Sequence, residues 1–237
     1  MAQAGLHGIA GLYLAEKKPS LESQFRYGLV LGALIPDVDF FPLALLYFFN
    51  SKLALSMHRS FTHSLLAVIV VTVFFLIKDR SKPGKSFAWG LGAGILLHIV
   101  MDIAVWFSGV DILWPLGMFG LPSKIHLWQN VAINPLLPKL MGALDYLFFG
   151  LYYIYLGSLA RRQGTDAQML PFLRRATLLQ WAFLVVFLAL VFVLSPSLFD
   201  IAHYAMFIPI FFPFCLYITV KMRKTIMGER ADVSHAA

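Results

Sequence analysis

The chain has 237 residues, of which 59% are hydrophobic and 13% are charged. A soluble domain carries about 45–50% apolar and about 25% charged residues, so this composition excludes an ordinary soluble domain and predicts a polytopic membrane protein. The single cysteine excludes a disulfide framework, and basic loops at a membrane surface explain the net charge of +7 better than nucleic-acid binding does.

Apolar stretches of about 20 residues, the length that crosses a bilayer, recur along the chain. The N-terminal stretch Ala2–Ala15 is too short to span and is expected to form a re-entrant or interfacial helix. The first long stretch is expected to break near Pro36 and Pro42, because proline removes a backbone donor. The sequence thus predicts an all-α bundle of about six spanning helices: Tyr27–Asn50, Phe61–Ile77, Phe87–Phe107, Met141–Ala160, Thr177–Leu194 and Ile201–Val220.

Basic segments alternate with loops that are poor in lysine and arginine. The basic ones are residues 16–26, 78–85, 161–175 and 221–230. Because cytoplasmic loops are enriched in Lys and Arg, this pattern predicts a bacterial inner-membrane protein with both termini in the cytoplasm. Residues 1–237 are expected to form one membrane domain, in which 1–120 carry the chemical motifs and 121–237 provide helical support.

Ionisable side chains lie inside the first three long stretches. They are Asp37, Asp39, His63, His98 and Asp102. A charged residue at the centre of a bilayer costs about 2.5–3.5 kcal/mol on insertion scales, so these groups must face water, pair with each other or hold a cation.

Spacing relates these groups to one another. His98 and Asp102 are four residues apart, which places both on one face of a helix. Asp37 and Asp39 follow a proline, and in an extended segment two such carboxylates project to the same side.

A third cluster precedes the second apolar stretch, in the sequence "MHRSFTHS". Ser60 is expected to cap the following helix and to place His63 in its first turn, with His58 and Arg59 just before the cap. In the predicted topology all three clusters can converge in one cavity that opens to the outer face.

Histidine combined with carboxylate is the ligand mixture of zinc, manganese and non-haem iron sites. The candidate ligands allow one to three divalent ions, with zinc favoured and manganese or iron as alternatives. Each residue also has a structural interpretation: His98 could form a helix–helix hydrogen bond, and Asp37 and Asp39 could cap the helix break. His126 and His203 lack a polar neighbour at ligand spacing, and Asp145 and Asp200 are expected at solvated helix ends.

The stretches "GALIPDVD", "HRSFTHSLL" and "LLHIVMDIAVWFSGVDILWPLG" resemble a family of membrane-bound, metal-dependent hydrolases, the YdjM-like or LexA-binding inner-membrane-associated hydrolases. The resemblance covers about residues 5–120. It implies supporting, substrate-binding roles for Arg59, Thr62 and Trp114, and it leaves Asp111 as a possible extra ligand. The segment Ala104–Trp106 departs from the more polar stretch expected in the family. The implied metal ligands are His7, Asp37, Asp39, His58, His63, His98 and Asp102.

The function predicted from these features is hydrolysis of a lipid-borne ester or phosphoester, a phospholipase-like activity. A cation acidifies water near neutral pH; Arg59 would hold a phosphate, and Asp39 would serve as the base. The predicted partners are membrane lipid and a lipid-like substrate, with no nucleic acid and no assigned protein partner. An ion- or proton-coupled transporter and a non-catalytic membrane scaffold remain alternatives.

Overall fold

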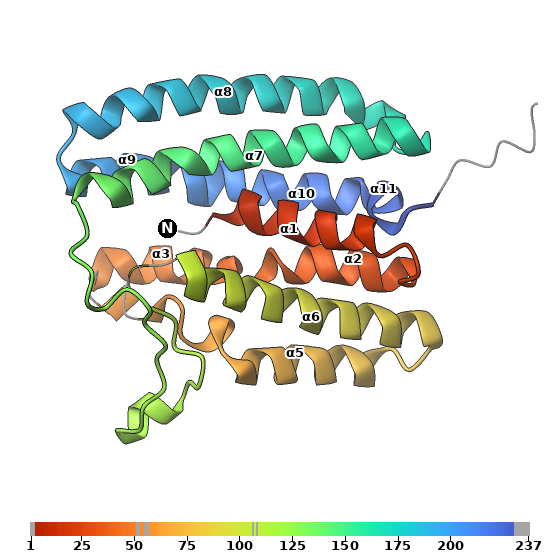
Figure 1. Cartoon of the computed structure of the whole chain (residues 1–237), viewed down its shortest axis with the longest axis horizontal. Coiled ribbons are helices and arrows are strands. Elements are labelled where there is room, and N and C mark those ends of the chain that lie inside the picture. The colour runs from red at the N-terminus through yellow and green to blue at the C-terminus, as the bar shows by residue number, and fades with distance from the viewer. Residues whose placement is uncertain (1–2, 51–52, 55–56, 106, 108, 230–237) are drawn as a thin grey trace, which may run out of the picture.

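The protein is described by a computed structural model that covers residues 3–50, 53–54, 57–105, 107 and 109–229. Within these ranges every regular element is a helix, apart from an isolated β-bridge between Val110 and Ile125. Figure 1 shows the long helices running side by side along one axis. The predicted all-α fold class is therefore confirmed.

The first half of the chain surrounds the break in the first span. Helix α2 ends at Gly32 and a 3-10 helix follows; the segment Ile35–Leu46, formed by this 3-10 helix and the first part of α3, is bent by 44° from α2. Pro36 lies in this 3-10 helix, as the missing N–H of a proline predicts. The elements are α1 Ala4–Lys17, α2 Ser23–Gly32, η1 Ile35–Asp39, α3 Phe40–Phe49, η2 Phe61–His63, α5 Leu65–Lys78 and α6 Lys82–Val105.

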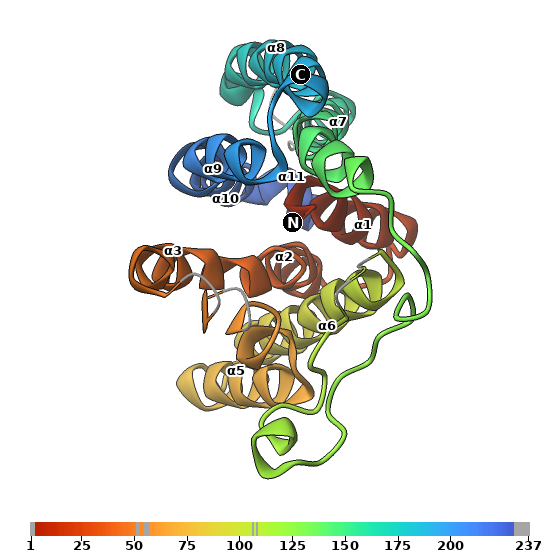
Figure 2. The same cartoon turned by 90° about the vertical axis from the view of Figure 1, so that its left-hand side faces the viewer.

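The second half packs against α1 through α7, in which Tyr146, Phe149, Tyr152 and Tyr153 are fully buried. Figure 2 shows α7, α8, α9 and α10 grouped on one side of α1, with α2, α5 and α6 on the other. The elements are η3 Leu116–Phe119, α7 Leu136–Gln163, η4 Ala167–Met169, α8 Leu170–Val193, α9 Pro196–Met206, the π-helical turn Phe207–Phe211, α10 Phe212–Lys221 and α11 Arg223–Met227.

The number of spans differs from the prediction. Among the described residues, four helical segments are long and apolar enough to cross a membrane, and the bent pair Ser23–Gly32 and Ile35–Leu46 would make five. The predicted total of six is not confirmed, because α5 has only 14 residues. At 1.5 Å per residue it is about 21 Å long, shorter than the roughly 30 Å hydrocarbon core.

The start of α5 corrects a second expectation. Ser64, and not Ser60, caps this helix: its hydroxyl accepts the N–H of Ala67, whereas the hydroxyl of Ser60 donates to the Met57 carbonyl oxygen. The prediction fails because residues 61–63 form a separate 3-10 turn ahead of the α-helix. His63 therefore lies in this turn and not in the first turn of α5.

Helices α2 and α6 approach each other closely because glycines line both surfaces. A Cβ atom added at Gly28 or Gly32 would lie 2.3 or 2.1 Å from a carbonyl oxygen of α6. A Cβ at Gly90 or Gly94 would lie 2.2 or 2.3 Å from a carbonyl oxygen of α2. Pairs of small residues four positions apart are a common packing device of membrane helices. The contact holds the end of α2 next to the polar face of α6.

Candidate metal centre

Five of the predicted ligands meet where α1, the broken span, η2 and α6 come together. Asp37 comes from η1, His63 from η2, and His98 and Asp102 from α6. His7 comes from α1, the short N-terminal helix. Each of the five is at most 2% exposed. The structure thus joins residues that are up to 95 positions apart in the sequence into one buried cluster.

The two aspartates of the broken span point to different partners. The sequence expectation that Asp37 and Asp39 project to the same side is wrong, because Ile35–Asp39 is a 3-10 helix and not an extended segment. With three residues per turn, neighbours two positions apart lie on different faces of such a helix. Asp37 faces the Nε2 atoms of His63 and His98, whereas Asp39 faces His58, Thr62 and the other ring nitrogen of His63, Nδ1, at 3.8 Å.

The innermost atoms lie at short and similar separations. Nε2 of His63 is 3.1 Å from Nε2 of His98, and both nitrogens are 3.6 Å from Oδ1 of Asp37. Oδ2 of Asp102 is 3.5 Å from the first nitrogen and 3.8 Å from the second. Two groups could hold a metal ion, each with ligand atoms within 4.8 Å of one another: Asp37, His63 and His98, and His7, His98 and Asp102.

Hydrogen bonds fix which ring nitrogens carry protons. Nδ1 of His98 donates to the carbonyl oxygen of Ala33 at 2.8 Å. The Thr62 hydroxyl donates its single proton to Oδ2 of Asp39 at 2.9 Å, so it can only accept from Nδ1 of His63, also at 2.9 Å. In the neutral rings both Nε2 atoms therefore carry lone pairs, and these two atoms face each other. A cation between the two Nε2 atoms would be bound by both lone pairs.

The distances suit a first-row divalent cation. Ligand bonds of about 2.1 Å in a tetrahedral site separate the ligand atoms by roughly 3.4 Å. The four inner atoms of Asp37, His63, His98 and Asp102 lie 3.1–3.8 Å apart where their distances are measured. Both oxygens of Asp37 are buried and have no hydrogen-bond partner among the described residues. The residues present thus fit a metal ion in both donor chemistry and spacing.

The two groups describe one centre rather than two. They share His98, and its Nδ1 already donates to Ala33, so both would use the same Nε2 atom. The His7 ring stacks on the His98 ring with centroids 3.8 Å apart, and its Nε2 lies 3.1 Å from Oδ1 of Asp102. His7 therefore lies at the flank of the centre, where the resemblance places a ligand.

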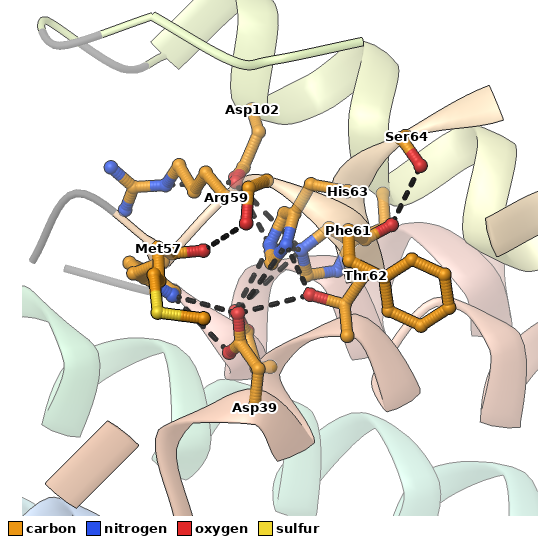
Figure 3. A network of polar contacts seen from close by, with 12 residues as sticks. Asp39, Met57, Arg59, Phe61, Thr62, His63, Ser64 and Asp102 are labelled. Carbon is orange, nitrogen blue, oxygen red and sulfur yellow. Dashed lines mark hydrogen bonds and ion pairs between the residues drawn. The ribbon is translucent and has the colours of Figure 1, made fainter. Parts of the chain in front are cut away.

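Asp39, His58 and Thr62 form an adjoining network, and Figure 3 shows Asp39 and Thr62 of this network beside His63. Nδ1 of His58 donates to the Asp39 carboxylate, at 3.1 and 3.2 Å from its two oxygens. Burial lowers the pKa of His58 well below its ordinary range, so this imidazole is neutral. The structure brings neither Asp39 nor His58 into the two groups above. Through Thr62, Asp39 orients His63 instead, as outer-shell carboxylates commonly do.

Arg59 lies against the other side of the centre, where Figure 3 shows it beside Asp102. Its Nε donates to Oδ2 of Asp102 at 3.2 Å, and the residue is 6% exposed. Its φ of 63° is in the left-handed region, which non-glycine residues rarely adopt. Its carbonyl oxygen accepts the N–H of Asp111 at 3.1 Å, which helps to hold this conformation.

Two residues of the implied set lie outside the cluster. The Trp114 ring packs edge-on against Phe61, with centroids 5.2 Å apart, and is not among the groups around His98. Asp111 contacts the backbone of Arg59 and likewise belongs to neither group. Trp106, in the departing segment, lies outside the described residues.

The structure also contains a buried pair that the sequence interpretation missed. Nε2 of His203 on α9 lies 3.1 Å from Oδ2 of Asp145 on α7, and both residues are at most 1% exposed. The expectation of a solvated helix end at Asp145 is wrong, because α7 begins at Leu136 and Asp145 lies more than two turns inside it. The available signal in the sequence was an acidic residue, Asp145, within an apolar stretch.

A comparison with known families places the chain. The family model described as "YdjM inner membrane protein" matches residues 4–224. The chain belongs to this family. The YdjM match includes the second half, well beyond the residues 5–120 that carry the motifs. Together with the apolar helices, it identifies a multi-pass membrane protein of an inner-membrane family.

A relative from Bacillus subtilis (strain 168), named "Uncharacterized protein YvsG", is 34% identical to this YdjM family member over 95 residues. The aligned part covers 36% of this chain and 53% of the relative, so the chain spans about half the length of that curated relative. No solved structure matches the chain.

Proposed function

We propose that the protein is a membrane-embedded, metal-dependent hydrolase that acts on a lipid-borne ester or phosphoester. The observation that carries the proposal is the pair of facing Nε2 atoms of His63 and His98, beside Asp37 oxygens that accept no hydrogen bond from the described residues. A divalent ion in this position, with zinc favoured, would act as a Lewis acid and would make water more acidic.

The charge balance supports a cation rather than a hydrogen-bonded core. Asp37, Asp39 and Asp102 surround the cluster, and Arg59 is the one guanidinium among its contacts in the described part of the chain. With neutral imidazoles and three ionised carboxylates, two negative charges would remain uncompensated in a buried site, which is costly within a membrane. One divalent cation would compensate both.

Residues around the centre would accept a proton and bind a phosphate group. Asp39 holds Nδ1 of His58, which leaves Nε2 of His58 with a lone pair and no hydrogen-bond partner among the described residues. This Asp–His pair is the proton acceptor in our proposal, with Asp39 acting through His58 rather than directly. Arg59, anchored by Asp102, supplies positive charge for a phosphate group.

The placement of the ionisable groups favours hydrolysis over transport. A proton-coupled transporter needs titratable groups along a path through the membrane. The second buried pair, Asp145 and His203, is separated from His58 by aromatic rings: Phe40 contacts His58, and Phe207 contacts both Phe40 and His203. Along this line of contacts, the apolar rings of Phe40 and Phe207 lie between the two groups.

Metal content tests the proposal directly. Purified protein should contain about one divalent ion per chain by elemental analysis. Asp102→Asn and His63→Ala should each lower this content to under about a third, because they remove ligand atoms of one centre. Asp145→Asn is the matched control, since it removes a buried carboxylate from the second pair and should leave the content unchanged. Metal-poor wild-type protein, with no difference among the variants, would refute the metal centre.

Hydrolysis requires a second measurement. The metal-loaded wild type should cleave a fluorogenic phosphodiester or carboxyl ester in mixed micelles. His58→Gln should lose most of this activity while it keeps its metal, because His58 belongs to neither metal-holding group. Retained activity in His58→Gln would remove the proposed proton acceptor.

A further inference from the structure

An open groove runs from the surface of the broken span to the edge of the metal centre. Its volume is about 490 Å³, within the range of roughly 300–1,000 Å³ typical of sites for small organic ligands. One wall is a stripe of α3 and η1 side chains that recurs every three or four residues from Ile35 to Leu46. The opposite wall consists of Met57 and residues 60–62.

The groove is apolar along its length and polar at one end. Val38, Met57 and Phe61 on its walls are 37–46% exposed, so the groove is open on its outer side. At its polar end the Thr62 hydroxyl bonds both Asp39 and His63, as Figure 3 shows. One side chain therefore separates the end of the groove from a candidate metal ligand.

We propose that this groove seats one acyl chain of the lipid whose ester or phosphoester reaches the centre, an inference that rests on the proposed function. The groove lies along Ile35–Leu46, the second part of the bent candidate span, where hydrocarbon would be the surrounding solvent. A lipid can slide its chain between the two walls without exposing it to water. Its linkage to the head group then arrives at Asp39 and Thr62.

The dimensions favour a hydrocarbon chain over a protein segment. From Asp39 to Leu46 the stripe extends for about 10 Å at 1.5 Å per residue, which is two helical turns. A second helix would need a longer seam, whereas a flexible chain fills a short apolar groove. The polar end supplies the orientation, because the linkage and head group are the polar parts of a lipid and its acyl chain is apolar.

Two tryptophan variants, one on each wall, test whether the groove holds an acyl chain. Leu43→Trp and Met57→Trp place an indole in the groove, and Leu45→Trp is the matched control. Leu45 lies on the same helix, is 69% exposed and does not line the groove. The full-length protein is reconstituted in phosphatidylethanolamine nanodiscs with a minor fraction of a phospholipid that carries a diazirine near the end of one acyl chain. Labelled peptides are identified by mass spectrometry.

The expected result is photolabelling of the groove walls that falls by about fivefold or more in both groove variants, because the indole occupies the space of the chain. Labelling of the exposed face of α8 around Val186 reports ordinary bilayer contact and should stay constant in all proteins. Groove labelling that is unchanged in Leu43→Trp and Met57→Trp would overturn the proposal.

Metal content measured in the same samples separates this inference from the proposed function. Leu43→Trp should keep the wild-type metal content, since Leu43 belongs to neither of the two metal-holding groups. Lost labelling with retained metal supports the acyl seat. Specific labelling of metal-free wild-type protein would keep the lipid seat and remove the hydrolase.

Discussion

Single hydrogen bonds decide what the candidate centre can do. Thr62 illustrates this, because its hydroxyl can donate only once and does so to Asp39. His63 must then donate through Nδ1, and its Nε2 is left to face His98. The sequence motif identified Thr62 as a supporting residue without showing how. Its role follows only from the direction of two hydrogen bonds.

Replacing Thr62 by valine should weaken metal binding by about 10–100-fold, the usual effect of losing an outer-shell partner. Valine has nearly the same shape but cannot accept the Nδ1 proton of His63, so the ring loses its fixed orientation. Titration against a chromogenic chelator measures the affinity. Thr62→Ser keeps the hydroxyl and should bind metal nearly as the wild type does. Equal affinities for Thr62→Val and the wild type would show that the hydroxyl does not orient the ring.

At the scale of elements, the site depends on how closely α2 and α6 approach each other. Sequence motifs predicted the broken span and the His98–Asp102 face, because proline and helical spacing act locally. They could not predict the position of α1, whose His7 reaches the cluster through contacts between distant segments. They also missed Asp145 and His203, since pairing between two helices leaves no spacing signal in one sequence.

Gly94→Ala tests the close approach of these helices. The added methyl group would lie 2.3 Å from the Leu29 carbonyl oxygen and 2.7 Å from the Ala33 nitrogen, so the helices must move apart. We expect a loss of about 1–3 kcal/mol in unfolding free energy, the typical cost of overpacking. Thermal unfolding in detergent measures it, and metal affinity should fall as well because Ala33 holds His98.

Gly150→Ala is the control for this substitution. A Cβ atom at Gly150 would meet its nearest neighbours at 3.5 Å, which is ordinary van der Waals contact. This variant should unfold within about 0.5 kcal/mol of the wild type. Equal losses in Gly94→Ala and Gly150→Ala would mean that the α2–α6 contact is not tightly packed.

At the scale of the whole molecule, the four basic segments meet at one end of the bundle. Lys82 pairs with Glu22 at 3.3 Å, and Arg162 pairs with Glu16 at 2.9 Å. Arg26 donates to the Met227 carbonyl oxygen near the end of the described chain. Figure 1 shows the corresponding helix ends together, with the long loop before α7 at the opposite end. Composition predicted this separation, because lysine and arginine counts reflect topology directly.

The positive-inside rule predicts that this basic end faces the cytoplasm and that the centre lies toward the outer leaflet. A C-terminal green fluorescent protein fusion should therefore fluoresce, whereas a C-terminal alkaline phosphatase fusion should be inactive. Phosphatase inserted after Gly120, in the loop at the opposite end, should be active. Active phosphatase at the C-terminus would reverse the orientation.

The kink between α2 and α3 does more than bend a span. The interruption leaves the Ala33 carbonyl oxygen available, and that oxygen accepts a hydrogen bond from Nδ1 of His98. Because this hydrogen bond uses the main chain of Ala33, replacing its methyl group by another small side chain would leave the bond intact. If a residue other than proline at position 36 allowed a continuous α-helix, such carbonyl oxygens would accept backbone N–H groups of the helix instead. The His98 imidazole would then be free to rotate, and the centre would no longer bind metal although every ligand residue was still present.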